Sequence, residues 1–211
     1  MDTAVDISGY IYENGEQNAS HEYLLPAVLE IIASLRIGPA DPRLFELGCG
    51  NGAVAETLTH RGYRIVGVDP SEQGITHAKT RYPHLDIHLG SAYEDLAVKY
   101  GRFPVVLSLE VVEHLYAPRL FAHTLFDLVE PGGTAVVSTP YHGYWKNLAL
   151  ALSGRLDRHF TALWDHGHIK FWSIPTLTQL LREAGFGPIT VHRVGRMPAL
   201  AKSMIAVARK R

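Results

Sequence analysis

Two carboxylates and an imidazole stand close together near the middle of the chain, in the run Glu110-Val111-Val112-Glu113-His114. If this run is helical, residues three and four positions apart share one face, so the three polar side chains point the same way. His114 could then be a general base toward a hydroxyl, because the imidazole pKa lies near neutral pH. Alternatively, Glu110, Glu113 and His114 could bind a divalent cation (Mg, Mn, Zn or Fe) that lowers the pKa of a bound hydroxyl. A third interpretation is that these candidate catalytic residues only cap and salt-bridge a helix.

A further ligand for such a cation would come from the segment 141–172, which offers His166 and His168. This segment is long for a connection and contains three tryptophans, so we expect a lid or a substrate-binding insertion. Its apolar and basic residues also allow weak contact with a membrane surface, while core packing is the plainer interpretation. The candidate substrate-binding residues outside the central run are His21, Tyr12, Tyr10 and Asn14 near the N-terminal helix, and His142, Tyr144 and Trp145 early in the segment.

The helices and strands that alternate along the chain must position these candidate site residues. Short runs rich in Val and Ile alternate with helical patterns, which predicts a mostly parallel sheet with helices on both faces. The central run follows one such strand directly, and the carboxyl ends of strands are where doubly wound folds place their active sites. Strands are predicted at 43–48, 63–69, 84–89, 103–109, 133–139, 188–195 and 203–209, and helices at 21–35, 51–60, 71–81, 118–129 and 174–184.

A glycine-rich turn follows the first predicted strand, with the pattern Glu46-x-Gly48-x-Gly50-x-Gly52. Glycine is needed where the backbone takes positive φ or where a ligand approaches the main chain closely. Asp69 closes the next predicted strand, where an acidic residue can accept hydrogen bonds from ribose hydroxyls. The turn therefore predicts a nucleotide-like ligand.

The one-residue spacing of these glycines differs from the dinucleotide-binding pattern and resembles motif I of class I S-adenosylmethionine-dependent methyltransferases. The resemblance spans about residues 40–210 and is nearest to the UbiG-like O-methyltransferases. It implies a Rossmann-like α/β fold with a doubly wound seven-stranded sheet, order 3-2-1-4-5-7-6, in which strand 7 is antiparallel. The other motifs that support it are Gly67-Val68-Asp69-Pro70-Ser71, Gly90-Ser91-Ala92, Val106-Leu107-Ser108-Leu109-Glu110, Leu128-Val129-Glu130-Pro131-Gly132-Gly133 and Glu183-Ala184-Gly185-Phe186.

The resemblance also implies roles for individual residues. Those that would bind S-adenosylmethionine are Glu46, Gly48 and Gly50 at its methionine end with Cys49 in the same turn, Asp69 at the ribose, Pro70 and Ser71 beside the adenosine, Ser91 and Ala92 near the adenine, and Ser108 and Leu109 at the sulfonium. The Glu-x-x-Glu-His pattern resembles the metal site of Hen1-like RNA methyltransferases and recurs in UbiG-like enzymes, without deciding whether an ion binds here.

We therefore expect a single methyltransferase domain over 1–211, with an N-terminal helical cap at 1–40 and the 141–172 insertion. The expected reaction is methyl transfer to a hydroxyl on a small aromatic or quinol-type acceptor. Alternatives are an RNA 2′-O-methyltransferase, an N- or C-methyltransferase of a small molecule, and a noncatalytic S-adenosylmethionine-binding partner of another enzyme.

Composition narrows these alternatives. The net charge of the 211-residue chain is -1, from 20 basic and 21 acidic residues, so nothing predicts a nucleic-acid partner. The lone cysteine, Cys49, excludes an internal disulfide. We find neither a signal peptide nor an apolar run of the ~20 residues that a membrane span requires, and we expect a cytoplasmic protein.

Overall fold

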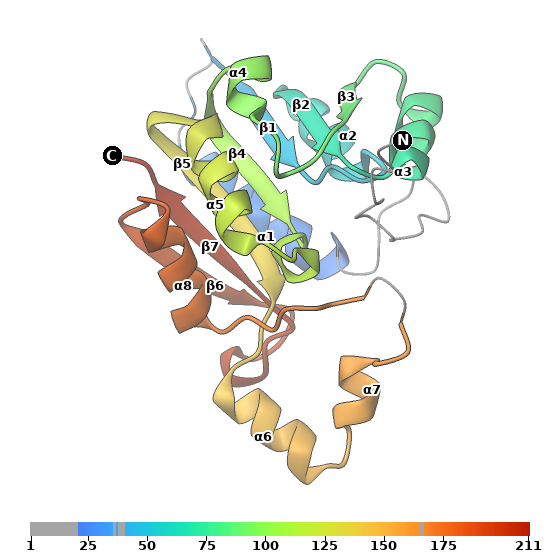
Figure 1. The fold of residues 1–211 in the computed structure, drawn as a ribbon, viewed down its shortest axis with the longest axis vertical. Coiled ribbons are helices and arrows are strands. Elements are labelled where there is room, and N and C mark those ends of the chain that lie inside the picture. The colour runs from blue at the N-terminus through green and yellow to red at the C-terminus, as the bar shows by residue number, and fades with distance from the viewer. Residues whose placement is uncertain (1–20, 36, 38–40, 165–166) are drawn as a thin grey trace.

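A computed structural model describes residues 21–35, 37, 41–164 and 167–211, and its centre is a seven-stranded sheet (Figure 1). The strand order is β3-β2-β1-β4-β5-β7-β6. The first five strands pair in parallel, and β7 is antiparallel to both of its neighbours. The predicted sheet order and direction are therefore confirmed. The strands are β1 (Arg43–Leu47), β2 (Arg64–Asp69), β3 (Asp86–Leu89), β4 (Phe103–Leu109), β5 (Val129–Pro140), β6 (Ile189–Val194) and β7 (Ser203–Arg209).

Helices cover both faces of the sheet, and each face has its own apolar core. One core joins the sheet to α4, α5 and α8, and the other joins it to α1, α2 and α3. Among the described residues, the α-helices are α1 (His21–Ser34), α2 (Ala53–Thr59), α3 (Glu72–Arg81), α4 (Leu96–Tyr100), α5 (Pro118–Leu128), α6 (Tyr144–Leu152), α7 (Leu156–Phe160) and α8 (Ile174–Glu183), and the short 3₁₀ helices are η1 (Val112–His114) and η2 (Pro198–Leu200).

Serine side chains cap the N-termini of two of the predicted helices. Ser71 accepts a hydrogen bond from the Gly74 amide at 3.1 Å, and Ser173 forms a capping box with Thr176. Three details differ from the prediction. Helix α4 was not predicted, because five residues show too little periodicity; β5 begins at Val129 instead of 133; and the central run is not an α-helix.

The segment 141–172 contains α6 and α7, which Figure 1 shows set apart from the sheet at one end of the molecule. Its two ends meet, because Tyr141 and Trp172 form an isolated parallel bridge and the His142 amide donates to the Trp172 carbonyl at 2.9 Å. None of the helices in the described part of the chain has the length and hydropathy that crossing a membrane requires.

Candidate functional site

The glycine turn at the end of β1 adopts the backbone conformation that its sequence predicts. Gly48, Gly50 and Gly52 have φ values of 88°, 51° and 78°. The amides of Gly48 and Cys49 both donate to the Val68 carbonyl, at 2.7 and 3.1 Å, which fixes the turn against β2. A Cβ at Gly48 would overlap a methyl group of Val111. The turn therefore lies directly against the central run.

Asp69, the last residue of β2, closes the other side of this turn. Its buried carboxylate accepts from the Gly50 amide at 2.8 Å and from the Ser71 amide at 2.9 Å. These bonds hold the first turn of α3 beside the glycines. Asp69 also lines the adjoining cavity.

Glu46 is a buried carboxyl group that the protein only partly satisfies. Within the described residues its Oε2 atom makes no hydrogen bond, although the side chain lines the cavity. Burial, and secondly the charge of Asp69, raise its pKa from the ordinary value of 4.5 to about 8. A cationic group on a ligand would satisfy this carboxylate and favour its ionised form.

Because the folded-state pKa of Glu46 is raised, the folded protein binds more protons than the unfolded chain between about pH 4.5 and 8. The contribution of Glu46 to the stability of the folded protein therefore falls as pH rises through that range. The substitution Glu46→Gln removes this pH-dependent loss of stability, because glutamine does not titrate. We expect the apoprotein variant to gain stability relative to wild type as pH rises, by at most about 1.4 kcal/mol per pH unit, and to bind S-adenosylmethionine more weakly. Urea unfolding at pH 5 and 8, together with calorimetry, measures both effects. A variant less stable than wild type at pH 8 would contradict this assignment.

The cavity has a volume of about 620 Å³ and extends from the glycine turn to the central run. Two predicted cofactor residues do not line it. Ser108 is fully buried and donates its hydroxyl to the Leu47 carbonyl at 2.8 Å, and Leu47 lies beyond the residues of β1 that pair with β4. Ser71 caps α3. The predicted residues that line it are Glu46, Gly48, Cys49, Gly50, Asp69, Pro70, Ser91, Ala92, Leu109, Glu110, His114 and His168.

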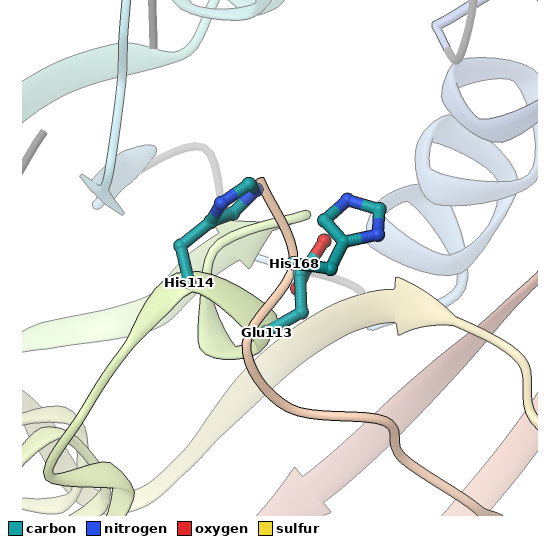
Figure 2. Close-up of side chains that lie close together, drawn as sticks. All are labelled: Glu113, His114 and His168. Carbon is teal, nitrogen blue, oxygen red and sulfur yellow. The ribbon is translucent and has the colours of Figure 1, made fainter. Parts of the chain in front are cut away.

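His114 and His168, which line the cavity, form a cluster with Glu113 in which one potential ligand atom of each residue lies within 4.8 Å of the others. Glu113 itself is buried and does not line the cavity. Figure 2 shows the carboxylate and the two imidazoles turned toward a common space. The imidazole centroids of His114 and His168 are 4.9 Å apart. Both carboxylate oxygens of Glu113 are buried, and within the described structure neither makes a hydrogen bond of ordinary geometry.

Backbone hydrogen bonds hold the two halves of this cluster together. The Glu113 carbonyl accepts from the amides of Ile169 and Lys170, both at 2.9 Å, and the Trp172 indole donates to the Val112 carbonyl at 3.3 Å. The end of the 141–172 segment is thereby fixed against η1, which brings His168 to a residue 55 positions earlier in the chain.

The electrostatics of the cluster suit a cation. Burial, and secondly Glu110, raise the pKa of Glu113 well above its ordinary value, so the protein compensates the ionised carboxylate only in part. Burial, and then His114, lower the pKa of His168 to about 4, so its imidazole is neutral at pH 7 and available as a ligand. The donor set of one carboxylate and two imidazoles therefore fits a divalent transition-metal ion.

Glu110 does not join this cluster, contrary to the predicted ligand set. It lies outside η1 with a positive φ of 55°, so the helical spacing on which the prediction depended is absent. Its Oε1 atom accepts from the Ser138 hydroxyl at 2.9 Å and its Oε2 atom from the Ser203 hydroxyl at 3.3 Å. The other predicted ligand, His166, lies outside the described residues.

The predicted substrate residues are only partly placed. His142 is buried against the rings of His159, Phe160 and Phe171 and does not line the cavity. Trp145 is 65% exposed, packs on Tyr144 and lies outside the lining as well. Both residues follow β5, where the chain continues to the start and the outer surface of α6, so their side chains lie away from the cavity. The side chain of His21, and all of Tyr10, Tyr12 and Asn14, lie outside what the structure describes.

Several cavity residues were not predicted, among them Tyr23, Ser203, Trp164 and Tyr116. Ser203 could have been found from topology, because an antiparallel β7 begins at the edge where the parallel strands end. The other three carry no motif, since an aromatic residue in a helix or loop is commonly part of a core.

A protein-family model described as a methyltransferase domain matches residues 19–191. The ubiquinone biosynthesis O-methyltransferase of Ruegeria pomeroyi is 33% identical over 152 residues, which is 70% of this chain and 60% of that protein. A probable S-adenosylmethionine-dependent methyltransferase of Mycolicibacterium smegmatis is 31% identical over 143 residues, 68% of this chain and 51% of that protein. The chain thus spans about half to three-fifths of the length of these curated relatives.

Solved structures agree on the fold. The methyltransferase domain of bacterial CtHen1 superposes with a TM-score of 0.68 at 19% identity, over 91% of this chain and all of that domain. A methyltransferase from Archaeoglobus fulgidus gives a TM-score of 0.65 at 16% identity, over 89% of this chain and 93% of the other. From the match to the domain model, the glycine turn and the sheet order, the chain belongs to the class I S-adenosylmethionine-dependent methyltransferases and is close to the ubiquinone biosynthesis O-methyltransferases.

Proposed function

We propose that this enzyme transfers the methyl group of S-adenosylmethionine to a hydroxyl oxygen, with a divalent ion held by Glu113, His114 and His168. The observation that carries this proposal is a single cavity that joins the glycine turn to the imidazoles of His114 and His168, beside a buried Glu113 carboxylate that has no hydrogen-bond partner of ordinary geometry among the described residues. The names of the curated relatives support an oxygen acceptor.

In the proposed reaction the protein contributes mainly position and the exclusion of water. Glu46 and the glycine turn hold the donor at one end of the cavity, and the acceptor oxygen attacks the methyl carbon in line as the carbon–sulfur bond breaks. When bound, the ion lowers the pKa of the acceptor hydroxyl, so that the oxygen attacks as its more nucleophilic anion. In the alternative without an ion, the His114 imidazole takes the hydroxyl proton directly.

We further propose a planar aromatic or quinol-type acceptor. The walls near the cluster are aromatic and apolar: Trp164 lies edge-on to His114 and His168, at centroid distances of 6.3 and 5.3 Å, and Leu115 and Tyr116 complete that side. Release of S-adenosylhomocysteine with 4-octylcatechol, and none with 4-octylaniline, is the expected result. Turnover of the amine alone would favour N-methylation and overturn the proposal.

The exposed surface of the insertion suggests how an apolar acceptor reaches this cavity. Trp145, Leu152 and Leu163 are 65%, 81% and 97% exposed, and the basic residues Arg155 and Arg158 flank them. Apolar side chains beside cations suit an anionic lipid surface. We propose weak membrane contact here. Wild type should co-sediment with vesicles containing phosphatidylglycerol, Leu152→Ser should bind less, and the exposed α4 control Val98→Ser should behave as wild type. Absence of wild-type binding would refute the contact.

A further inference from the structure

A chain of hydrogen bonds runs along the cavity wall formed by α1 and the start of β7. The Tyr23 and Ser203 hydroxyl oxygens are 3.1 Å apart, and Ser203 donates to the Oε2 atom of Glu110 at 3.3 Å. Ser138 donates to the Oε1 atom of the same carboxyl group at 2.9 Å. All three members of the Tyr23–Ser203–Glu110 chain line the cavity. The wall therefore ends in a phenol group supplied by the N-terminal helix.

The direction of the hydrogen bonds among Tyr23, Ser203 and Glu110 decides whether the Tyr23 phenol donates or accepts a hydrogen bond toward the cavity. A hydroxyl group has one hydrogen, and Ser203 uses its hydrogen on Glu110. With the Glu110 carboxylate ionised, the hydrogen between Tyr23 and Ser203 comes from Tyr23. The Tyr23 oxygen is left with lone pairs, so toward the cavity it is a hydrogen-bond acceptor and not a donor.

The Tyr23 ring is held in place by its surroundings. The Lys202 ammonium lies 4.6 Å from the ring centroid, and a Cβ at Gly195 would come within 2.9 Å of the Tyr23 Cδ2 atom. Both of these neighbours lie in the connection between β6 and β7. After burial, the charges of Glu110 and Glu113 contribute to raising the pKa of Tyr23.

We propose that Tyr23 is a specificity-determining residue whose phenol oxygen accepts a hydrogen bond from a second hydroxyl group of the acceptor, beside the one that is methylated. The inference rests on the proposed function, which assigns the reacting oxygen to the Glu113 cluster. The fixed oxygen of Tyr23 then selects acceptors that carry a second hydroxyl donor. A site built to hydrogen-bond a hydroxyl discriminates strongly against analogues that lack it, because its own polar group is otherwise left unpaired.

The test compares binding of 4-octylcatechol and 4-octylphenol by calorimetry, with S-adenosylhomocysteine and Mn²⁺ present. We expect wild type to bind the catechol at least tenfold more tightly than the phenol. In Tyr23→Phe the catechol affinity should fall about tenfold, while the phenol affinity should stay within twofold of wild type. Tyr63→Phe, outside the cavity, should match wild type.

Ser203→Ala is a second variant that keeps the phenol but frees its hydrogen, and it should also reduce the preference for the catechol. Equal weakening of both probes in Tyr23→Phe, or an unchanged preference, would overturn the role of Tyr23. If neither probe binds wild type, the proposed aromatic acceptor fails and this inference with it. Affinity for S-adenosylhomocysteine alone should be unchanged in both variants, which separates a loss of selectivity from a loss of folding.

Discussion

Replacing Glu113 with glutamine is expected to abolish binding of a divalent ion and to reduce the rate of methyl transfer at least 100-fold. The substitution keeps the size of the side chain and removes the one negative charge in the three-residue cluster. An amide oxygen is a much weaker ligand than a carboxylate, and an acceptor hydroxyl that keeps its proton is a poor nucleophile. Elemental analysis and initial rates of S-adenosylhomocysteine formation measure the two effects.

This loss should not come from unfolding. Both carboxylate oxygens of Glu113 are buried without hydrogen bonds of ordinary geometry in the described structure, so a neutral amide should be tolerated at least as well in the absence of an ion. The melting temperature of the ion-free variant should equal or exceed that of wild type. Glu183→Gln, on the exposed side of α8, is the matched control and should keep both the ion and the rate. An active Glu113→Gln enzyme without bound metal would exclude metal assistance.

The second large effect is expected for Gly48→Ala, which should weaken binding of S-adenosylmethionine at least tenfold and lower the melting temperature. An alanine here must hold a φ of 88° and also overlap Val111, whose branched side chain has little rotamer freedom. Since Val111 lies between Glu110 and Glu113, the displacement would disturb both the glycine turn and the cluster of Glu113, His114 and His168. Calorimetry and thermal unfolding report these changes.

The variant Gly62→Ala separates the backbone strain of an alanine at positive φ from the overlap of its Cβ with Val111. Gly62 also has a left-handed φ, of 90°, but an added Cβ would meet no described atom within 4 Å. It should therefore show only the backbone cost, about 1 kcal/mol, and unchanged affinity for S-adenosylmethionine. Similar behaviour of the two variants would show that the contact between the glycine turn and Val111 is unimportant.

The donor side of the site could be predicted from sequence because its chemistry is local. The positive φ angles at Gly48, Gly50 and Gly52 require a residue type that the sequence shows directly, and Asp69 ends a strand that its apolar run defines. Ser108 was misplaced, because membership of a motif does not tell which way a side chain turns. Its hydroxyl satisfies a strand-end carbonyl instead of facing the cavity.

The acceptor side depends on contacts between distant parts of the chain. His168 joins Glu113 through backbone bonds of the neighbouring residues Ile169 and Lys170, and no local pattern encodes these bonds. The assumption of helical spacing failed at Glu110, where the left-handed backbone turns the carboxylate toward two serines. Periodicity cannot reveal a single strained residue of this kind at the end of a strand.

The most direct measurement is the initial rate of S-adenosylhomocysteine formation from S-adenosylmethionine and 4-octylcatechol, with chelator-treated protein before and after addition of Mg²⁺, Mn²⁺ or Zn²⁺. We expect a rate at background in chelator that at least one added ion restores, with the methyl group recovered on oxygen. An equal rate with and without metal would contradict the assignment of Glu113, His114 and His168 as an ion site that activates the acceptor.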